Sequence, residues 1–246
     1  MMRFIFATVL FVVFFGQIGA QSTAFVFQGG LTVGLQKWDN SFDREPLLAY
    51  HGDLAIESVN NEDDRSSIFA QIGYHIKGSA TRFRFFNINS GFPSSATFTE
   101  RFEFRNLSLI LGAKQKFNLG ASGRARYYYF GGIRGDYTLS TNIDELASRS
   151  GNVLFYPLVG FMNRWMVGIS AGGGLEFNLN EVLGGEVKLS LHPDFTLQYN
   201  QPSIRTGYTN PYNGGQQLVI DERRIRNTAI ELSVGLRLLR KVVYVE

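Results

Sequence analysis

Three histidines and their acidic neighbours are the side chains of this sequence most able to do chemistry. His51 and His75 lie on the polar faces of two successive expected strands, and a turn near Asp63 would place them opposite each other. His192 and Asp194 are two positions apart and share a face. Imidazoles beside carboxylates can transfer protons or bind a metal ion. No recognisable lipase, protease or acyltransferase constellation accompanies them, so we expect a buried polar network with no catalytic residue and no metal.

A larger set of charged side chains shares these inward faces, and its two signs nearly balance. The expected lumen polar network comprises His51, Asp53, Glu57, His75, Lys77, Arg124, Arg126, Arg134, Asp136, Glu176, Glu186, Lys188, His192, Asp194, Glu231 and Arg237. A lumen of about eight strands is just wide enough for side chains to fill. Because unpaired buried charges are costly, these groups should pair with one another. The sequence therefore predicts a plugged lumen, with a narrow ion or water path as the alternative.

The elements that must position these residues show a period of two. From 27 to 36 apolar and polar or small residues alternate, and the pattern recurs at 48–58, 68–77, 107–114, 124–137, 165–177, 186–197 and 230–238. Such alternation predicts strands with one apolar and one polar face. We expect an all-β fold, a closed up-and-down antiparallel transmembrane β-barrel of eight strands, with ten as the alternative count. A soluble antiparallel sandwich would give the same alternation.

The connections between these strands are alternately short and long. Short turns are expected near 60–66, 115–120 and 178–184, and longer loops near 37–46, 87–96, 140–157 and 200–223. This is the connectivity of an outer-membrane barrel with both termini on the periplasmic side. Aromatic residues near the strand ends would suit interfacial girdles. These residues are Trp38, Tyr50, Tyr137, Trp165 and Tyr199.

The first twenty residues have the pattern of a cleaved signal peptide. Arg3 supplies the positive charge, residues 4–16 the apolar core, and Gly19-Ala20 the small-residue cleavage site. A retained anchor is the alternative, although the apolar run falls short of the ~20 residues of a spanning helix. Residues 21–246 then form one barrel domain. With no cysteine and a net charge of +3, the chain has neither disulfides nor the charge of a nucleic-acid binder.

Two segments are candidate partner surfaces. Changes of face parity between Lys77 and Arg82 and between Arg105 and Leu107 predict β-bulges, beyond which residues 81–104 would project as a hairpin. The second segment is the 200–223 loop. The candidate contact residues are Phe83, Phe85, Phe92, Phe98 and Phe102 in the hairpin and Tyr208 and Tyr212 in the loop. The alternative for the hairpin is that tilted strands bury its rings in lipid.

Several strands also resemble a known family. Residues 105–114, RNLSLILGAK, resemble the "YLEIPLLLKY" strand of the PorT-like outer-membrane β-barrel family of Bacteroidota, with Ile110 in place of the family's proline. Residues 128–133 resemble its "YLGAG" strand and 168–177 its "GLGAGVEY" strand, and 231–238 are similar to its closing strand. The resemblance implies a Bacteroidota outer membrane. A few relatives take part in secretion or gliding.

The function predicted from these patterns is that of a non-enzymatic outer-membrane protein of a Gram-negative bacterium. It would be a structural or accessory component of the envelope, in contact with outer-membrane lipid and with other envelope proteins, and would need no cofactor. A narrow pore is one alternative. A small-barrel hydrolase that uses inward His51, His75 or His192 is the other.

Overall fold

The computed structural model of the chain describes residues 22–38, 44–59, 65–86, 93–120, 124–150, 158–209, 215 and 217–240. The expected signal peptide lies outside these residues. In the described part of the chain, no helix has the length and apolar character needed to cross a bilayer.

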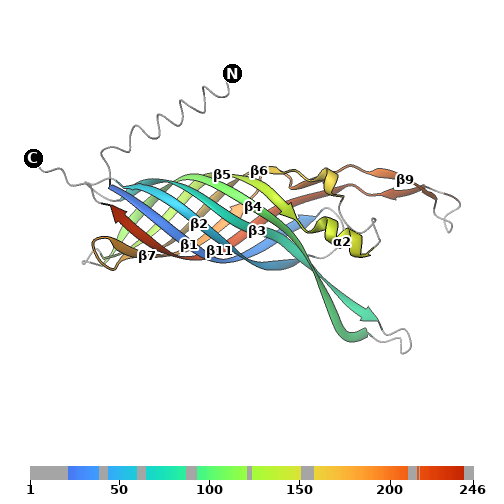
Figure 1. Cartoon of the computed structure of the whole chain (residues 1–246), viewed down its shortest axis with the longest axis horizontal. Coiled ribbons are helices and arrows are strands. Elements are labelled where there is room, and N and C mark those ends of the chain that lie inside the picture. Colours follow the sequence, from blue (N-terminus) through green and yellow to red (C-terminus); the bar gives the residue numbers. More distant parts are fainter. Residues whose placement is uncertain are drawn as a thin grey trace, which may run out of the picture.

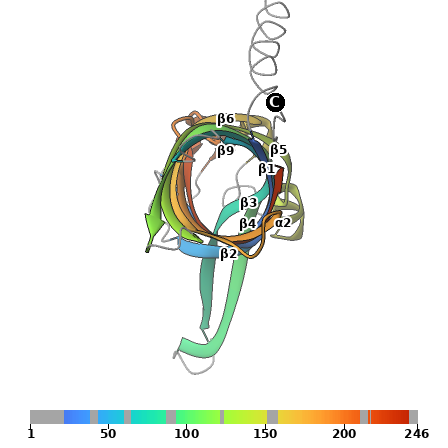
Figure 2. The same cartoon turned by 90° about the vertical axis from the view of Figure 1, so that its left-hand side faces the viewer.

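Eight long antiparallel strands form a closed ring (Figures 1 and 2). They are β1 (Ser22–Trp38), β2 (Glu45–Val59), β3 (Ser66–Phe86), β4 (Pro93–Leu119), β5 (Ala125–Thr141), β6 (Trp165–Asn178), β7 (Leu183–Pro193) and β11 (Arg223–Arg240). Each strand pairs with the next, and β1 pairs with β11 from Thr23–Arg240 to Trp38–Ile225. The eight-stranded barrel is confirmed. The ten-stranded count is wrong because the ring contains eight strands. The soluble sandwich is wrong because β1 pairs with β11 and closes a single sheet.

Shorter elements lie at the end of the barrel away from the termini, here called the rim (Figure 1). They are α2 (Ile143–Ser150), the 3-10 helix η2 (Val159–Phe161), and the strands β8 (Tyr199–Gln201), β9 (Ile204–Thr209) and β10 (Gln217–Ile220). Strand β8 pairs with β11, and β9 and β10 form a separate hairpin. The long expected loops at 140–157 and 200–223 therefore contain regular structure.

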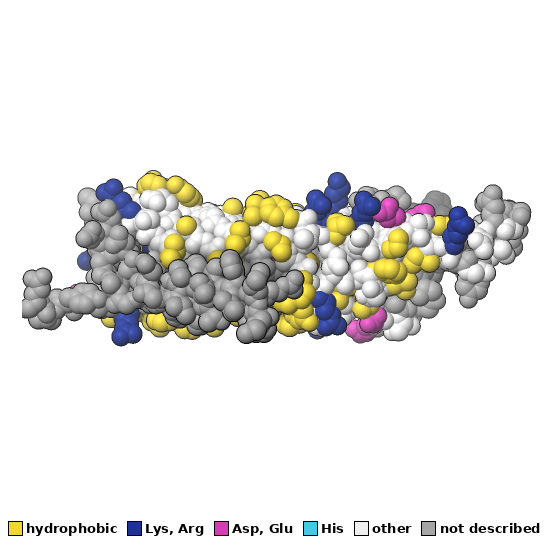
Figure 3. Space-filling model, turned by 90° about the horizontal axis from the view of Figure 1, so that it is seen from above, with side chains coloured by type: hydrophobic (Ala, Val, Ile, Leu, Met, Phe, Trp, Pro, Cys, Tyr) yellow, Lys and Arg dark blue, Asp and Glu magenta, His cyan; other side chains and the backbone are white. Residues whose placement is uncertain are grey.

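The two faces of the wall differ as the alternation predicts. Leu31, Leu54, Leu109 and Val234 point outward and are exposed, whereas the polar residues between them are buried in the lumen. Figure 3 shows hydrophobic side chains along the barrel wall, with Lys, Arg, Asp and Glu toward its two ends. An apolar band around a polar interior is the arrangement of a barrel that crosses a membrane.

The expected aromatic girdle is correct only in part. Tyr50 and Trp165 are exposed, and the centroids of the Trp165 and Tyr137 rings are 4.8 Å apart. Trp38 and Tyr199 are instead buried inside the rim, so the girdle prediction is wrong for both. Their side chains face inward and pack against the segments that cover the lumen.

The β3–β4 hairpin continues beyond the barrel and bends away from it (Figure 1). Its internal ladder runs without a register shift from Ser66–Gln115 to Arg84–Thr97. Shifts occur on its outer sides, between Pro46 and His51 on β2 and between Arg105 and Asn106 on β4, where it pairs with β5. Bulges therefore flank the hairpin where it leaves the ring, close to the positions that parity predicted.

Candidate functional site

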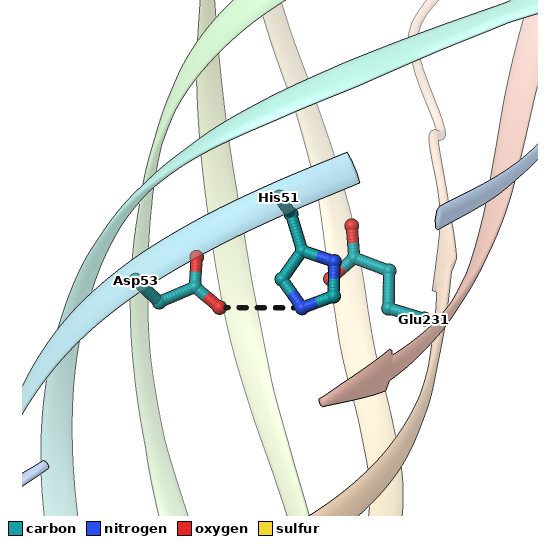
Figure 4. A group of neighbouring side chains, drawn as sticks. All are labelled: His51, Asp53 and Glu231. Carbon is teal, nitrogen blue, oxygen red and sulfur yellow. Dashed lines mark ion pairs between the residues drawn. The ribbon is translucent and has the colours of Figure 1, made fainter. Parts of the chain in front are cut away.

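Three histidines and two carboxylates meet in the middle of the lumen. We call His51, Asp53, His75, His192 and Glu231 the histidine cluster, and all are at most 4% exposed. Strand alternation directs each side chain inward, and His51 lies directly opposite His75 in the β2–β3 ladder, as expected. Figure 4 shows that Asp53 and Glu231 approach His51 from β2 and β11.

His75 joins the two carboxylates of the cluster. Its Nε2 lies 3.1 Å from Asp53 Oδ1, and its Nδ1 lies 2.5 Å from Glu231 Oε1. Gly73 makes this approach possible, since a Cβ there would lie 1.9 Å from Asp53 Oδ1 and 2.7 Å from His75 Nε2. The Nδ1 contact to Glu231 is a hydrogen bond, whereas the Nε2 contact to Asp53 is an ion-pair approach that meets no hydrogen-bond geometry.

His51 is oriented by two hydroxyl groups. Its Nδ1 lies 3.0 Å from Thr32 Oγ1, and its Nε2 lies 2.8 Å from Ser233 Oγ. Thr32 donates its hydroxyl hydrogen to Glu231 Oε1 at 3.4 Å, so it can accept a hydrogen bond from His51 Nδ1. In this assignment the lone pair on Nε2 accepts a hydrogen bond from Ser233 Oγ, and Nε2 also lies 4.0 Å from Asp53 Oδ2.

His192 forms the third branch of the cluster. Its Nδ1 lies 2.8 Å from Ser170 Oγ, and its Nε2 lies 2.9 Å from Ser190 Oγ and 3.0 Å from Glu231 Oε2. A serine, histidine and carboxylate in contact can relay a proton, as nucleophilic hydrolases require. Ser170 and His192 are each 1% exposed, so a substrate could reach this hydroxyl only if the barrel opened.

Ion pairs fill the lumen between the cluster and the rim. Lys77, Arg134, Asp136 and Asp194 form the rim-side ion cluster. Lys77 and Arg134 each contact both carboxylates, with Lys77 Nζ 3.1 Å from Asp194 Oδ1 and Arg134 Nε 3.0 Å from Asp136 Oδ2. Two cations and two carboxylates therefore neutralise each other here.

Ion pairs also fill the lumen between the cluster and the short turns. The turn-side ion cluster comprises Glu57, Lys114, Lys116, Glu176, Glu186 and Arg237. Lys114 Nζ lies 3.2 Å from Glu57 Oε2 and 3.4 Å from Glu186 Oε1. Arg237 contacts all three carboxylates. Three cations again face three carboxylates, and Glu57, Lys114 and Glu186 of this layer line a cavity of about 20 Å³.

A hydrophobic cap covers the lumen at the rim. It comprises Trp38, Phe102, Phe104, Ile143, Leu146, Tyr199 and Ile225. The guanidinium of Arg44 lies 3.3 Å from the centroid of the Trp38 ring and 4.5 Å from that of Phe102. Burial, together with the nearby positive charge of Arg223, lowers the pKa of Arg44 to about 10. The cation is held there by aromatic faces, which attract it electrostatically.

The structure brings together most of the predicted network. Arg124 is the exception: it is exposed in the turn before β5, so its assignment to the lumen is wrong. Arg126, two residues further along, is half-buried. Lys114 and Lys116 belong to the turn-side ion cluster but were not part of the predicted network. Lys114 ends the strand expected at 107–114, and Lys116 falls in the turn expected at 115–120. The continued alternation of Lys114, Lys116 and the apolar Phe117 was the signal for a longer strand.

The predicted partner residues separate into different environments. Phe98 is 50% exposed on the hairpin, whereas Phe102 is 3% exposed and packs edge-on against Trp38, with ring centroids 5.4 Å apart. The partner assignment of Phe102 is therefore wrong. Phe83 and Phe85 lie in β3 and Tyr208 in β9, but their side chains are outside the described part of the structure. Phe92 and Tyr212 lie outside the described residues altogether.

The closed ring, the apolar exterior and the filled polar interior together define an outer-membrane-type β-barrel. Solved outer-membrane proteins have a similar architecture. OprG from Pseudomonas aeruginosa matches with a TM-score of 0.50 at 12% identity, over 91% of this chain and 99% of OprG. The Neisserial surface protein A gives 0.43 at 10% identity, over 87% and 97% of the two chains. The outer-membrane protease OmpT from Escherichia coli gives 0.40 at 9% identity, over 89% and 97%.

No protein-family model matches the sequence, and no curated protein matches it. At these identities the likeness shows the fold alone.

Proposed function

We propose that the chain is a non-enzymatic outer-membrane protein with a plugged barrel, which serves as an accessory component of an envelope assembly. The observation that carries this proposal is the distribution of polar groups. Three layers of mutually contacting charged residues and a hydrophobic cap fill the lumen from the turns to the rim. The work of such a barrel must then be done at its surfaces, since a filled lumen offers no wide aqueous path.

The β3–β4 hairpin is the surface we propose for partner contact. It extends beyond the rim (Figure 1) and carries the exposed Phe98. An extended ribbon also leaves main-chain groups on its outer edges, which a partner strand can pair with. The resemblance to PorT-like proteins supports a role in a secretion or gliding assembly of a Bacteroidota outer membrane. In the proposed orientation the rim faces the outside of the cell, so both termini are periplasmic and the hairpin is extracellular.

Deletion of residues 87–96 tests the partner surface. Epitope-tagged wild type and deletion variant would be cross-linked in native outer membranes, solubilised in detergent and purified. We expect the 87–96 deletion to lose the envelope proteins that wild type retains. A deletion of 210–214 tests the other candidate surface, the 200–223 loop, and should keep these proteins if the β3–β4 hairpin is the contact. Retention of every partner by the 87–96 deletion would contradict the proposal.

Single-channel recording tests the plug. The purified barrel, inserted in planar bilayers, should show no defined conductance steps at physiological salt. Steps that disappear in Glu176→Gln would instead favour the narrow pore, because Glu176 contacts Arg237 within the turn-side ion cluster.

A further inference from the structure

The histidine cluster has the donor atoms of a transition-metal site. We propose that His51, Asp53 and Glu231 bind one divalent ion of the zinc class inside the barrel. Each offers one ligand atom, and these atoms lie within 4.8 Å of one another. The site goes beyond the accessory role proposed above and differs from the sequence-based expectation of no metal.

The first argument is the unsatisfied carboxylate of Asp53. Its side chain is fully buried, yet neither of its oxygen atoms has a hydrogen-bond partner among the described residues. Its ion pairs to His75 and His51, at 3.1 and 4.0 Å, are its described contacts. A buried carboxylate without hydrogen bonds is costly, and a bound cation is one of the few groups that removes this cost.

The second argument is the charge balance of the lumen. The ion clusters on either side pair equal numbers of carboxylates and Lys or Arg side chains. The middle layer has two carboxylates, Asp53 and Glu231, and one lysine, Lys188, whose described hydrogen bond goes to Gln71 at 3.2 Å. This layer therefore needs further positive charge, which either a proton on His75 or a metal ion can supply.

The third argument is geometry. Zinc bonds to imidazole nitrogen and carboxylate oxygen are about 2.0–2.2 Å long and point to the corners of a tetrahedron, so two ligand atoms of one ion are about 3.4 Å apart. His51 Nε2 and Asp53 Oδ2 are separated by 4.0 Å and would have to approach each other by roughly 0.6 Å to share a tetrahedral ion. A separation of 4.8 Å, the upper limit in the triad, needs a closure of roughly 1.4 Å, which rotation of a carboxylate about its side-chain torsions can provide.

Support for the imidazole is also present. A metal-binding histidine usually donates its second ring N–H to a neighbouring acceptor, which fixes its orientation. Thr32 is placed to do this for His51 Nδ1, at 3.0 Å, and it also contacts Glu231 Oε1. One hydroxyl thus orients two of the three ligands.

The donor types select the ion. The chain has no cysteine, which excludes a thiolate site, and calcium and magnesium prefer sites built from oxygen alone. Mixed imidazole and carboxylate donors suit zinc, cobalt and related ions. Since the three ligands are at most 4% exposed, the ion would enter while the barrel folds.

The test is metal retention after refolding. Residues 21–246 would be refolded in detergent with Zn²⁺ or with EDTA, desalted and analysed for metal, and a parallel sample refolded with Co²⁺ would be examined for visible d–d absorption. We expect about one zinc per folded chain. The Co²⁺ sample should show the visible d–d absorption of an ion with a low coordination number, which differs from that of aqueous Co²⁺. A folded wild type that retains no zinc and gives only the spectrum of aqueous Co²⁺ would overturn the proposal.

Variants then identify the ligands. Asp53→Asn should lose zinc retention, and Thr32→Val, which keeps all three donors, should weaken Zn²⁺ affinity by about 10-fold to 100-fold. Glu176→Gln is the matched control, since it neutralises a buried carboxylate of the turn-side ion cluster and should retain zinc fully. Folding of each variant is checked by its heat-dependent shift on SDS gels. Full zinc retention by folded Asp53→Asn and Thr32→Val would overturn the assignment.

Discussion

At the scale of single residues, Gly73 decides how close the groups of the histidine cluster can come. The absence of a Cβ at this position leaves the space in which Asp53 and His75 meet. Gly52 lies on β2, the strand that pairs with β3, and faces the lipid side of the wall. A Cβ there would meet nothing within 4 Å. The contact between Asp53 and His75 therefore requires a glycine at position 73, whereas no steric contact requires one at position 52.

Gly73→Ala should destabilise the barrel by about 1–3 kcal/mol, because the added methyl overpacks the lumen and separates Asp53 from His75. Gly52→Ala is the matched control, with an expected change within about 0.5 kcal/mol. Urea unfolding of both variants in detergent micelles measures the difference. Equal stability of the two would show that the tight contact at Gly73 relaxes without cost.

Much of the site could be predicted from the sequence, since a period of two assigns each residue to a face once a strand is recognised. The opposition of His51 and His75 followed from the turn between their strands. The role of Thr32 could not be predicted in this way, because its contact to Glu231 joins β1 to β11 across the closure. Contacts across the lumen depend on strand tilt and on the register of that closure, and neither is encoded in local alternation.

At the scale of elements, strand β4 of the β3–β4 hairpin has two environments that follow one another with distance from the ring. Phe102 faces inward and belongs to the hydrophobic cap, whereas Phe98, four residues earlier, is exposed beyond the rim. The prediction of a partner surface on this hairpin is therefore wrong for Phe102, whereas Phe98 is exposed. The residues nearest the ring close the lumen, and only those further out are available to a partner.

Phe102→Ala should cost about 3–5 kcal/mol of folding free energy, because it leaves a cavity beside Trp38 and removes an edge-on ring contact. Phe98→Ala removes the same side chain from an exposed position and should change stability by no more than about 0.5 kcal/mol. Guanidinium unfolding followed by tryptophan fluorescence compares them. A similar loss in both variants would place Phe98 in a packed environment as well.

Element boundaries were the least predictable part of the fold. Strand β4 continues to Leu119 through the turn expected at 115–120, because inward lysines and outward apolar residues continue its alternation. The hairpin of β9 and β10 was expected to be loop, since its Tyr, Asn and Gly content is typical of both turns and short ribbons. The amino-acid composition of this segment does not distinguish a loop from a hairpin, whereas the pairing of β9 with β10 in the structure does.

At the scale of the whole molecule, the barrel presents apolar side chains to its surroundings and keeps its charges inside, the reverse of a soluble protein. Val234 lies near the middle of the β1–β11 ladder and is 64% exposed. Val219 in β10 is 44% exposed, on the hairpin beyond the rim. An arginine introduced at each of these two positions therefore tests whether the position faces hydrocarbon or water.

Val234→Arg should destabilise the barrel in lipid vesicles by about 2–4 kcal/mol, because an arginine near the bilayer midplane must be taken out of water. Val219→Arg should change stability by at most about 0.5 kcal/mol. Equilibrium unfolding in vesicles measures both. If Val234→Arg were as mild as Val219→Arg, the outward band would not lie in hydrocarbon.

The pairing of β1 with β11 also has a consequence for biogenesis. Thr23 must find Arg240, so the ring cannot close until β11 has been synthesised and exported. Until then the hydrogen-bonding groups of both outer strands are unpaired, and such edges invite aggregation. A nascent chain of this kind would depend on holding factors during its transit, and a truncation that removes only β11 would abolish assembly as a whole.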